Sequence, residues 1–191
     1  MNLSSFDALI LAGGKSSRFK SDKTLVPFKS SPSLTHFSFD KLKTQFKSVK
    51  ICAKEQKFSP PLPLLKDNFS DFAPIFVLAN LGEFYENPVF ILPADMPNVS
   101  ISSIIKLFEN FTNCEVNYAK TMQKEHFLCG VFSPKIAKIA REQILKNDLA
   151  IKNLLKHCKA KSTLFTDENE FININYQKDL ENSKNSKNSA I

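Results

Sequence analysis

Short apolar runs alternate with segments of helical periodicity along most of this chain. The runs expected to form strands are 8–11, 49–53, 62–66, 89–92, 116–121 and 127–132. The segments expected to form helices are 34–46, 74–85, 101–108, 136–145 and 151–155. Near-continuous apolar strands that alternate with helices are typical of a parallel sheet covered on both faces. The sequence therefore predicts an α/β fold, a three-layer αβα sandwich around a mainly parallel, Rossmann-like sheet.

The length and composition of the chain predict a single domain. A chain of 191 residues fits one domain with a sizeable core, and no internal linker divides the sequence. Hydrophobic residues make up 42% of it, as in ordinary globular domains. Residues 182–191 are polar and repetitive, which is typical of disordered segments. We expect one domain over residues 1–181, followed by a disordered tail.

The distribution of charge and cysteine argues against several classes of protein. The net charge is +7, but no run of Lys and Arg reaches the five to eight residues of a nucleic-acid patch. No apolar run approaches the roughly 20 residues of a membrane span, and no secretory signal pattern opens the chain. The four cysteines are not spaced as zinc ligands. We expect a reduced, cytoplasmic protein that binds neither nucleic acid nor a membrane.

Half of the four glycines lie side by side, at Gly13 and Gly14, directly after the first expected strand. Such a pair lets the backbone turn tightly and lets a ligand approach its N–H groups. The pattern is not a Walker loop, which would need a glycine at Leu9, and it lacks the third glycine of a dinucleotide fingerprint. The planar guanidinium of Arg18 can bind two phosphate oxygens at once, and the ammonium of Lys23 adds a compact positive charge. The loop is therefore expected to cradle a polyphosphate.

Two carboxylates are expected at the same edge of the sheet as this loop. Asp67 follows the third expected strand, and Asp95 follows the fourth, between two prolines. In open α/β sheets, ligands bind beyond the carboxyl ends of the strands. Mg²⁺ is commonly held by one or two carboxylates together with phosphate oxygens. We interpret Asp95 as a Mg²⁺ ligand, the alternative being a turn or capping residue.

The histidines and cysteines offer no convincing catalytic dyad. His36 and His157 fall in expected helices and are predicted to lie at the surface. His126 opens an expected strand, where a structural role and a contact to a second substrate are the two interpretations. Cys129 has apolar neighbours, which favours a buried thiol over a nucleophile.

The run Leu11-Ala12-Gly13-Gly14, followed by Arg18 and by Asp22-Lys23, resembles the signature loop of the nucleotidyltransferases that activate sugars and cofactors with an NTP. Within them, the sequence most resembles the molybdenum cofactor guanylyltransferase (MobA) family. Three later segments carry this finer resemblance: the acidic segment 66–71, the histidine-containing strand 126–130 and the closing segment 171–180 with its Phe-x-Asn-x-Asn pattern. The similarity runs from about residue 8 to residue 180.

The resemblance implies transfer of GMP from Mg-GTP to molybdopterin, with release of pyrophosphate. It implies that the catalytic residues are Arg18, Lys23 and Asp95, with Asp95 as the metal ligand. It implies that the nucleotide-binding residues are Leu11, Ala12, Gly13, Gly14, Lys23, Asp67 and Asp95. It places the second substrate beside His126, Asn173 and Asn175. The implied partners are GTP, molybdopterin, other proteins of molybdenum cofactor biosynthesis, and acceptor molybdoenzymes or their chaperones.

Three positions depart from the pattern of the family. Lys20 and Ala73 stand where the family has glycines, and Cys52 stands where some relatives have an asparagine. The position of Cys52 belongs to the side of the site that contacts guanine, so the identity of the nucleotide stays open. Two alternative activities follow: a cytidylyltransferase for molybdopterin and a sugar-phosphate nucleotidyltransferase of the same superfamily. The lost loop glycine at Lys20 motivates a further alternative, a nucleotide-binding module without enzymatic activity.

Overall fold

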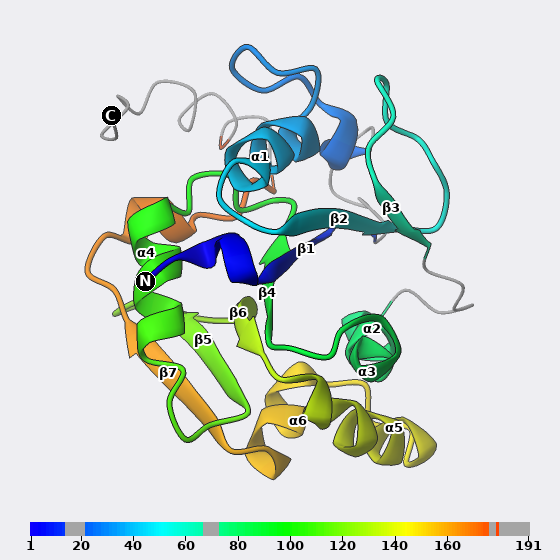
Figure 1. The fold of residues 1–191 in the computed structure, drawn as a ribbon, viewed down its shortest axis with the longest axis vertical. Coiled ribbons are helices and arrows are strands. Elements are labelled where there is room, and N and C mark those ends of the chain that lie inside the picture. The colour runs from blue at the N-terminus through cyan, green and yellow to red at the C-terminus, as the bar shows by residue number, and fades with distance from the viewer. Residues whose placement is uncertain (14–21, 67–72, 176–178, 180–191) are drawn as a thin grey trace.

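A computed structural model describes residues 1–13, 22–66, 73–175 and 179, and its centre is a seven-stranded sheet (Figure 1). The strands lie in the order β3-β2-β1-β4-β6-β5-β7. Their bounds are β1 Asp7–Leu11, β2 Ser48–Ala53, β3 Leu64–Lys66, β4 Val89–Pro93, β5 Val116–Lys120, β6 Glu125–Phe132 and β7 Ala160–Leu164. The expected tail, residues 182–191, lies outside the described residues, so the domain boundary stays a prediction.

The sheet is parallel except at one strand. β3, β2, β1 and β4 pair in parallel, as do β5 and β7, whereas β6 runs antiparallel to both β4 and β5. The amino-terminal half of the chain thus forms a parallel sheet whose strands all end at the same edge. This confirms the predicted α/β fold with a mainly parallel sheet.

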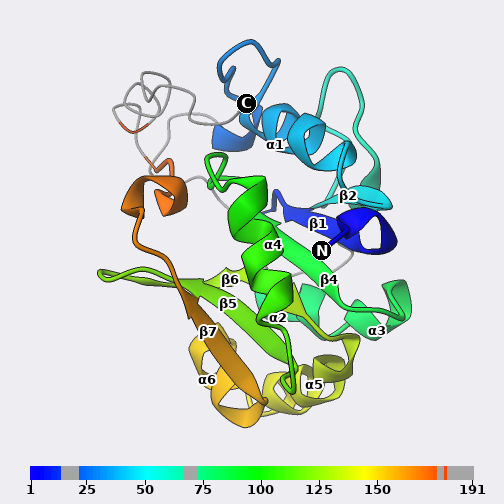
Figure 2. The ribbon, with the colours of Figure 1, turned by 60° about the vertical axis from the view of Figure 1, so that its left-hand side comes forward.

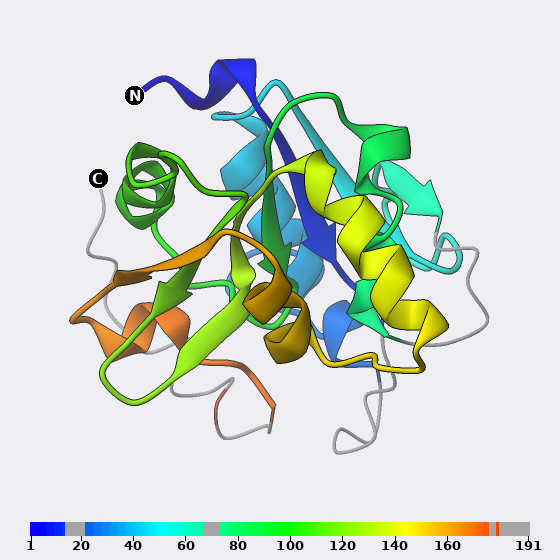
Figure 3. The same cartoon turned by 90° about the horizontal axis from the view of Figure 1, so that it is seen from below.

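Helices cover both faces of the sheet and complete the three layers. Helices α1 and α4 pack on one face, and α2, α3, α5 and α6 pack on the other (Figures 1 and 2). Seen from below, α5 and α6 cross in front of the strands (Figure 3). The α-helices are α1 Leu34–Lys43, α2 Pro74–Leu78, α3 Leu81–Phe84, α4 Ile101–Glu109, α5 Ala137–Leu145 and α6 Ile151–His157. The described residues also form the 3₁₀ helices η1 Leu3–Ser5, η2 Lys23–Leu25, η3 Pro134–Ile136 and η4 Glu168–Phe171.

Every strand except β7 supplies side chains to two hydrophobic clusters, because successive residues of a strand point to opposite faces. In β1, Ile10 belongs to the cluster beneath α1 and α4, whereas Leu9 belongs to the cluster beneath the other four helices. Both residues are completely buried. The near-continuous apolar runs of the sequence are therefore explained by a sheet that is covered on both sides.

The expected helix over 74–85 is two helices instead of one. α2 ends at Leu78 and α3 begins at Leu81, so Ala79 and Asn80 form a break. The Nδ2 atom of Asn80 donates to the carbonyl of Phe76 at 2.8 Å. A short amide side chain that bonds nearby backbone competes with helix formation, which explains why the helix is interrupted here.

The sequence does not predict β7. β7 is an edge strand with three exposed residues, so it lacks the apolar run that marks the inner strands.

The surface position predicted for His36 is wrong. His36 is buried on the inner face of α1, where its Nδ1 lies 2.7 Å from Ser33 Oγ and its Nε2 lies 2.9 Å from the Pro60 carbonyl. His157 is exposed, as expected. No helix in the described part of the chain is long and apolar enough to cross a membrane.

Candidate functional site

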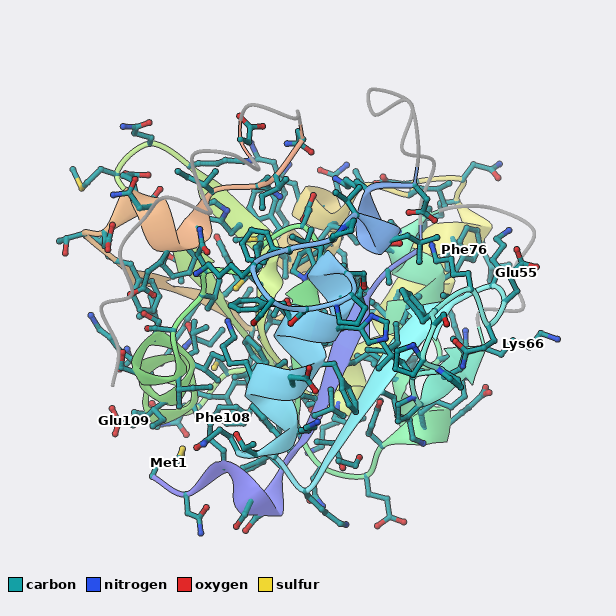
Figure 4. All side chains as sticks on the ribbon, turned by 90° about the horizontal axis from the view of Figure 1, so that it is seen from above. Met1, Glu55, Lys66, Phe76, Phe108 and Glu109 are labelled. Carbon is teal, nitrogen blue, oxygen red and sulfur yellow. The ribbon has the colours of Figure 1, made fainter. Side chains whose placement is uncertain are left out.

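The carboxyl ends of β2, β1 and β4 form the floor of the candidate site. Ala12 N donates to the carbonyl of Cys52 at 2.9 Å, and Ala94 N donates to the carbonyl of Leu11 at 3.0 Å. These bonds continue the parallel pairing past the ends of the strands. In Figure 4 the β2 arrow runs from the side of Met1 towards that of Glu55, which marks the carboxyl edge of the sheet. The backbone expected to face a nucleotide therefore lies at this edge.

Four polar side chains meet beside this floor. The Nζ atom of Lys23 lies 2.7 Å from Asp95 Oδ2 and donates to Asn175 Oδ1 at 3.0 Å. The Nδ2 atom of Asn173 donates to the other carboxylate oxygen of Asp95 at 3.1 Å. The side chains of Lys23 and Asp95 are only 22% and 15% exposed. The structure thus brings together four residues that were predicted from distant parts of the sequence.

The closing segment is fixed against Asp95 by its backbone as well. Ile174 N donates to the carbonyl of Asp95 at 2.8 Å, and the Ile174 side chain is buried with Phe28 and Leu34. Asn175 N donates to Asp179 Oδ2 at 3.1 Å. Because buried Ile174 lies between them, Asn173 is held at the carboxylate of Asp95 and Asn175 at the ammonium of Lys23.

His126 lies near this cluster without joining it by a hydrogen bond. Its side chain is buried, its ring centroid lies 5.4 Å from that of Phe171, and its Nε2 has no hydrogen-bond partner among the described residues. Burial and the ammonium of Lys124 lower the pKa of His126, against the opposing carboxylates of Glu168 and Asp95. The imidazole is therefore favoured in its neutral form, with one ring nitrogen unused.

Three predicted site residues, Gly14, Arg18 and Asp67, lie outside the described residues. Their expected roles at the phosphates and the guanosine stay predictions. Of the residues expected to contact the nucleotide through backbone, Leu11 ends β1, Ala12 is buried and Gly13 is exposed beyond it. The described part of the site is therefore the β1 end together with the cluster around Asp95.

Sequence reasoning missed two lysines at the site. Lys57 follows β2, and its Nζ lies 2.6 Å from Asp22 Oδ2 and 3.1 Å from the carbonyl of Ala12. Lys124 precedes β6 and donates to Asn173 Oδ1 at 3.1 Å. The rule that sites form beyond strand ends could have pointed to Lys57, since it lies in the loop after a parallel strand. Nothing in the local sequence distinguishes either lysine from the other lysines of the chain.

The donor set around Lys23 suits a hard cation. The ammonium of Lys23 is bound by a carboxylate oxygen of Asp95 and an amide oxygen of Asn175, the kinds of oxygen that Mg²⁺ prefers. Among the described residues, no group of three or more His, Cys, Asp or Glu could form a metal cage. A single carboxylate that shares Mg²⁺ with substrate phosphates is the usual arrangement for this ion. The residues present therefore fit Mg²⁺ bound together with a nucleotide.

Comparison of the sequence with known families finds one match that covers most of the chain. A family model described as the MobA-like NTP transferase domain matches residues 8–162. A molybdenum cofactor guanylyltransferase from Campylobacter jejuni (strain RM1221) is 34% identical over 188 residues, which are 96% of this chain and 98% of that relative. One from Helicobacter pylori (strain J99) is 32% identical over 185 residues, 94% of this chain and 88% of the relative.

Solved structures share the fold. A putative protein from Aquifex aeolicus VF5 superposes with a TM-score of 0.77 at 33% identity, over 91% of this chain and 95% of that one. The molybdopterin-guanine dinucleotide biosynthesis protein A of Archaeoglobus fulgidus superposes with a TM-score of 0.76 at 18% identity, over 94% and 97% of the two chains. At 18% identity, the similarity to the Archaeoglobus fulgidus protein shows a shared fold alone.

Proposed function

The chain belongs to the MobA-like NTP transferase family, and from that premise we propose that it transfers GMP from GTP to molybdopterin. The products are molybdopterin guanine dinucleotide and pyrophosphate. The observation that best supports this proposal is the meeting of Lys23, Asp95, Asn173 and Asn175 beside the carboxyl end of β1. A cation, a carboxylate and two amides at this edge suit a reaction between two phosphorylated substrates.

The reaction is a substitution at phosphorus. An oxygen of the terminal phosphate of molybdopterin forms a bond to the α-phosphorus of GTP, and the bond from that phosphorus to the bridging oxygen breaks, so that pyrophosphate leaves. The attacking phosphate is already anionic at neutral pH, so no general base is needed. Catalysis then rests on positioning and on neutralising the charge of the phosphates.

Lys23 and Asp95 have the central roles in this proposal. The ammonium of Lys23 would exchange its bond to Asp95 for the phosphates of GTP, where it stabilises the charge that develops on pyrophosphate. Asp95, with the amide oxygen of Asn175 beside it, would hold Mg²⁺. When bound, Mg²⁺ supplies charge neutralisation and a template for phosphate oxygens.

The remaining site residues are assigned roles by their positions in the family pattern. Arg18 binds phosphate oxygens, Asp67 binds the guanosine, and the backbone of 11–14 lines the nucleotide. Asn173, Asn175 and His126 face the second substrate. For His126, the unused and buried Nε2 atom supports this role, because a ligand could satisfy it.

The proposal is tested by nucleotide selectivity. Purified protein is given Mg²⁺, a molybdopterin-bearing acceptor, and GTP, CTP or UTP in turn, and the release of pyrophosphate is measured. We expect turnover with GTP at least tenfold above that with CTP or UTP. Preference for CTP would identify a cytidylyltransferase, and turnover with a sugar phosphate in place of molybdopterin would identify the other alternative. Nucleotide binding without any turnover would identify a binding module.

We further propose that the enzyme works in a reducing, cytoplasmic setting, to which its four cysteines, none of them in a disulfide bond, are suited. Its product is a dinucleotide cofactor that a molybdoenzyme must take up. The protein partners that the proposal implies are acceptor molybdoenzymes or their chaperones and other cofactor biosynthesis proteins.

A further inference from the structure

One ammonium group joins the two described segments on either side of residues 14–21. The Nζ atom of Lys57 donates to the carbonyl of Ala12 at 3.1 Å and lies 2.6 Å from Asp22 Oδ2. Ala12 directly follows β1, and Asp22 directly precedes η2, which begins with Lys23. We infer that Lys57 is a positioning residue, which holds Asp22, and through it Lys23, against the end of β1. This inference rests on the proposed role of Lys23 at the nucleotide phosphates.

Asp22 divides its two carboxylate oxygens between Lys57 and η2. Its Oδ1 accepts from Thr24 N at 3.0 Å and from Thr24 Oγ1 at 2.7 Å, which makes Asp22 the N-cap of η2. Burial alone would raise the pKa of Asp22, but the bonds from Lys57 and Thr24 outweigh it and hold that pKa below its ordinary value. The carboxylate therefore stays ionised and can tie Lys57 to the first turn of η2.

The segment that carries Lys57 is itself fixed. Gln56 Nε2 donates to the carbonyl of Leu62 at 2.8 Å, and Phe58 is buried in the cluster beneath α1 and α4. The ion pair between Lys57 and Asp22 is only partly exposed, at 20% and 33% of the two side chains. At its other side, Thr24 is held by α1, because Thr35 Oγ1 donates to the Thr24 carbonyl at 2.9 Å. η2 is thus anchored at both sides of Lys23.

This arrangement gives Lys57 a different task from Lys23. Its charge is already matched by Asp22, so it acts on the nucleotide through the placement of Lys23. Without the tie, a triphosphate could still draw Lys23 into place, but binding would then include the cost of ordering η2. Loss of Lys57 should therefore weaken nucleotide affinity and leave the rate of the bound complex nearly unchanged.

The test compares Lys57→Met, Asp22→Asn, the double variant and Lys57→Arg. Asparagine keeps an oxygen for the N-cap of η2 but cannot pair with Lys57. We expect each single variant, Lys57→Met and Asp22→Asn, to raise both the KM and the Kd for GTP about tenfold, with kcat changed less than threefold. The double variant should raise the KM and the Kd no more than either single variant does, because all three variants remove the same ion pair between Lys57 and Asp22. Lys57→Arg should recover part of the affinity.

Lys47→Met is the matched control, since it removes one positive charge from an exposed position just before β2, at the opposite edge of the sheet. A Kd for Lys57→Met equal to that of Lys47→Met would overturn the inference, as would a double variant weakened about a hundredfold. The Kd is measured without acceptor, with GTP or with whichever triphosphate the unmodified protein binds best. Failure of the proposed function is visible separately, as absence of transfer by the unmodified protein.

Discussion

The Nζ atom of Lys23 lies 2.7 Å from Oδ2 of Asp95, although 72 positions separate the two residues in the sequence. The contact joins the start of η2 to the loop after β4. Each group neutralises the other while no substrate is present. A nucleoside triphosphate would replace Asp95 as the anionic partner of Lys23, and a divalent cation would replace Lys23 as the cationic partner of Asp95. The pair is therefore suited to separate when substrate binds.

Asp95→Asn should reduce GMP transfer at least about a hundredfold, because removal of one preorganised electrostatic contact commonly costs that much. Asparagine keeps the shape of the side chain but leaves Lys23 without its counter-charge and removes the carboxylate proposed to hold Mg²⁺. The measurement is kcat at saturating GTP and Mg²⁺. Asp40→Asn, which breaks an exposed pair with Lys43 on α1, should leave kcat unchanged. Retention of more than a tenth of the rate by Asp95→Asn would contradict the assignment.

Glu170→Gln should loosen the closing segment. The Oε2 atom of Glu170 accepts from Ser100 N at 3.2 Å, Ser100 Oγ at 2.9 Å and Ser103 Oγ at 2.6 Å. These bonds clamp η4 to the first turn of α4, where a negative charge is also favoured by the helix dipole.

The neutral amide introduced by Glu170→Gln would weaken this clamp, and we expect the free energy of unfolding in urea to fall by about 1–2 kcal/mol. Since Asn173 follows three residues later, transfer should also slow severalfold. Glu109→Gln, at the other end of α4 and on the side of Met1 (Figure 4), should change neither quantity. Equal effects of the two substitutions would show that Glu170 is not a clamp.

Lys41 should make stability depend on pH. Its ammonium donates to the carbonyls of Pro97 and Val99, just after Asp95, at 2.7 and 2.5 Å. Burial, opposed by Cys129 and Glu170 and aided by Lys29, lowers the pKa of Lys41 to about 8 from an ordinary value of 10.5. Between these two values the unfolded chain binds more protons at this residue than the folded chain, so the folded state gains stability as the pH rises.

The measurement is the difference in unfolding free energy between the unmodified protein and Lys41→Met, followed from pH 7 to 10. The difference should be flat up to about pH 8 and then move in favour of the unmodified protein, by at most about 1.4 kcal/mol per pH unit. Lys43→Met, an exposed position on the same helix, should give a flat difference throughout. A flat curve for Lys41→Met would contradict the lowered pKa.

Gly130→Ala should be strongly destabilising. A Cβ atom at this position would lie 2.4 Å from the carbonyl oxygen of Asn117 and 2.7 Å from Cα of Tyr118. Both are backbone atoms of β5, which cannot move aside as a flexible side chain can. We expect a loss of about 3 kcal/mol in thermal or urea unfolding. Gly82→Ala in α3 is the control, because its Cβ would make ordinary contacts at 3.6 Å or more, and it should stabilise slightly.

Much of this architecture could be predicted from the sequence, because apolar periodicity reports burial on each face of a strand or helix. The inner strands followed from that rule, as did the placement of Asp95 and of the loop that leads to Lys23 beyond the ends of β4 and β1. Asn173 and Asn175 were reached only through family resemblance, since no local pattern shows that residue 174 would pair with the backbone of Asp95. β7 and the break at Asn80 were missed because both depend on exposure and side-chain bonding that hydropathy does not record.

Lys57 and His36 show the same limit at the level of single residues. Each makes its defining contacts with residues that are distant in the sequence: Lys57 with Ala12 and Asp22, and His36 with Pro60. A lysine in a loop and a histidine on a helix are ordinary surface residues until the fold supplies such partners. Tertiary contacts of this kind lie beyond what one sequence can indicate.

The reversed direction of β6 has a consequence for how this enzyme can change. Since β6 runs against β4, it is the beginning of β6, with His126, that reaches the edge where β1 and β4 end. A hairpin turn leads into it, with Met122 76% exposed near the tip. Such a turn tolerates insertion and substitution far better than a crossover helix does. With His126 facing the second substrate, as proposed, changes in the β5–β6 turn would alter acceptor preference without changing the parallel strands that are proposed to bind the nucleotide.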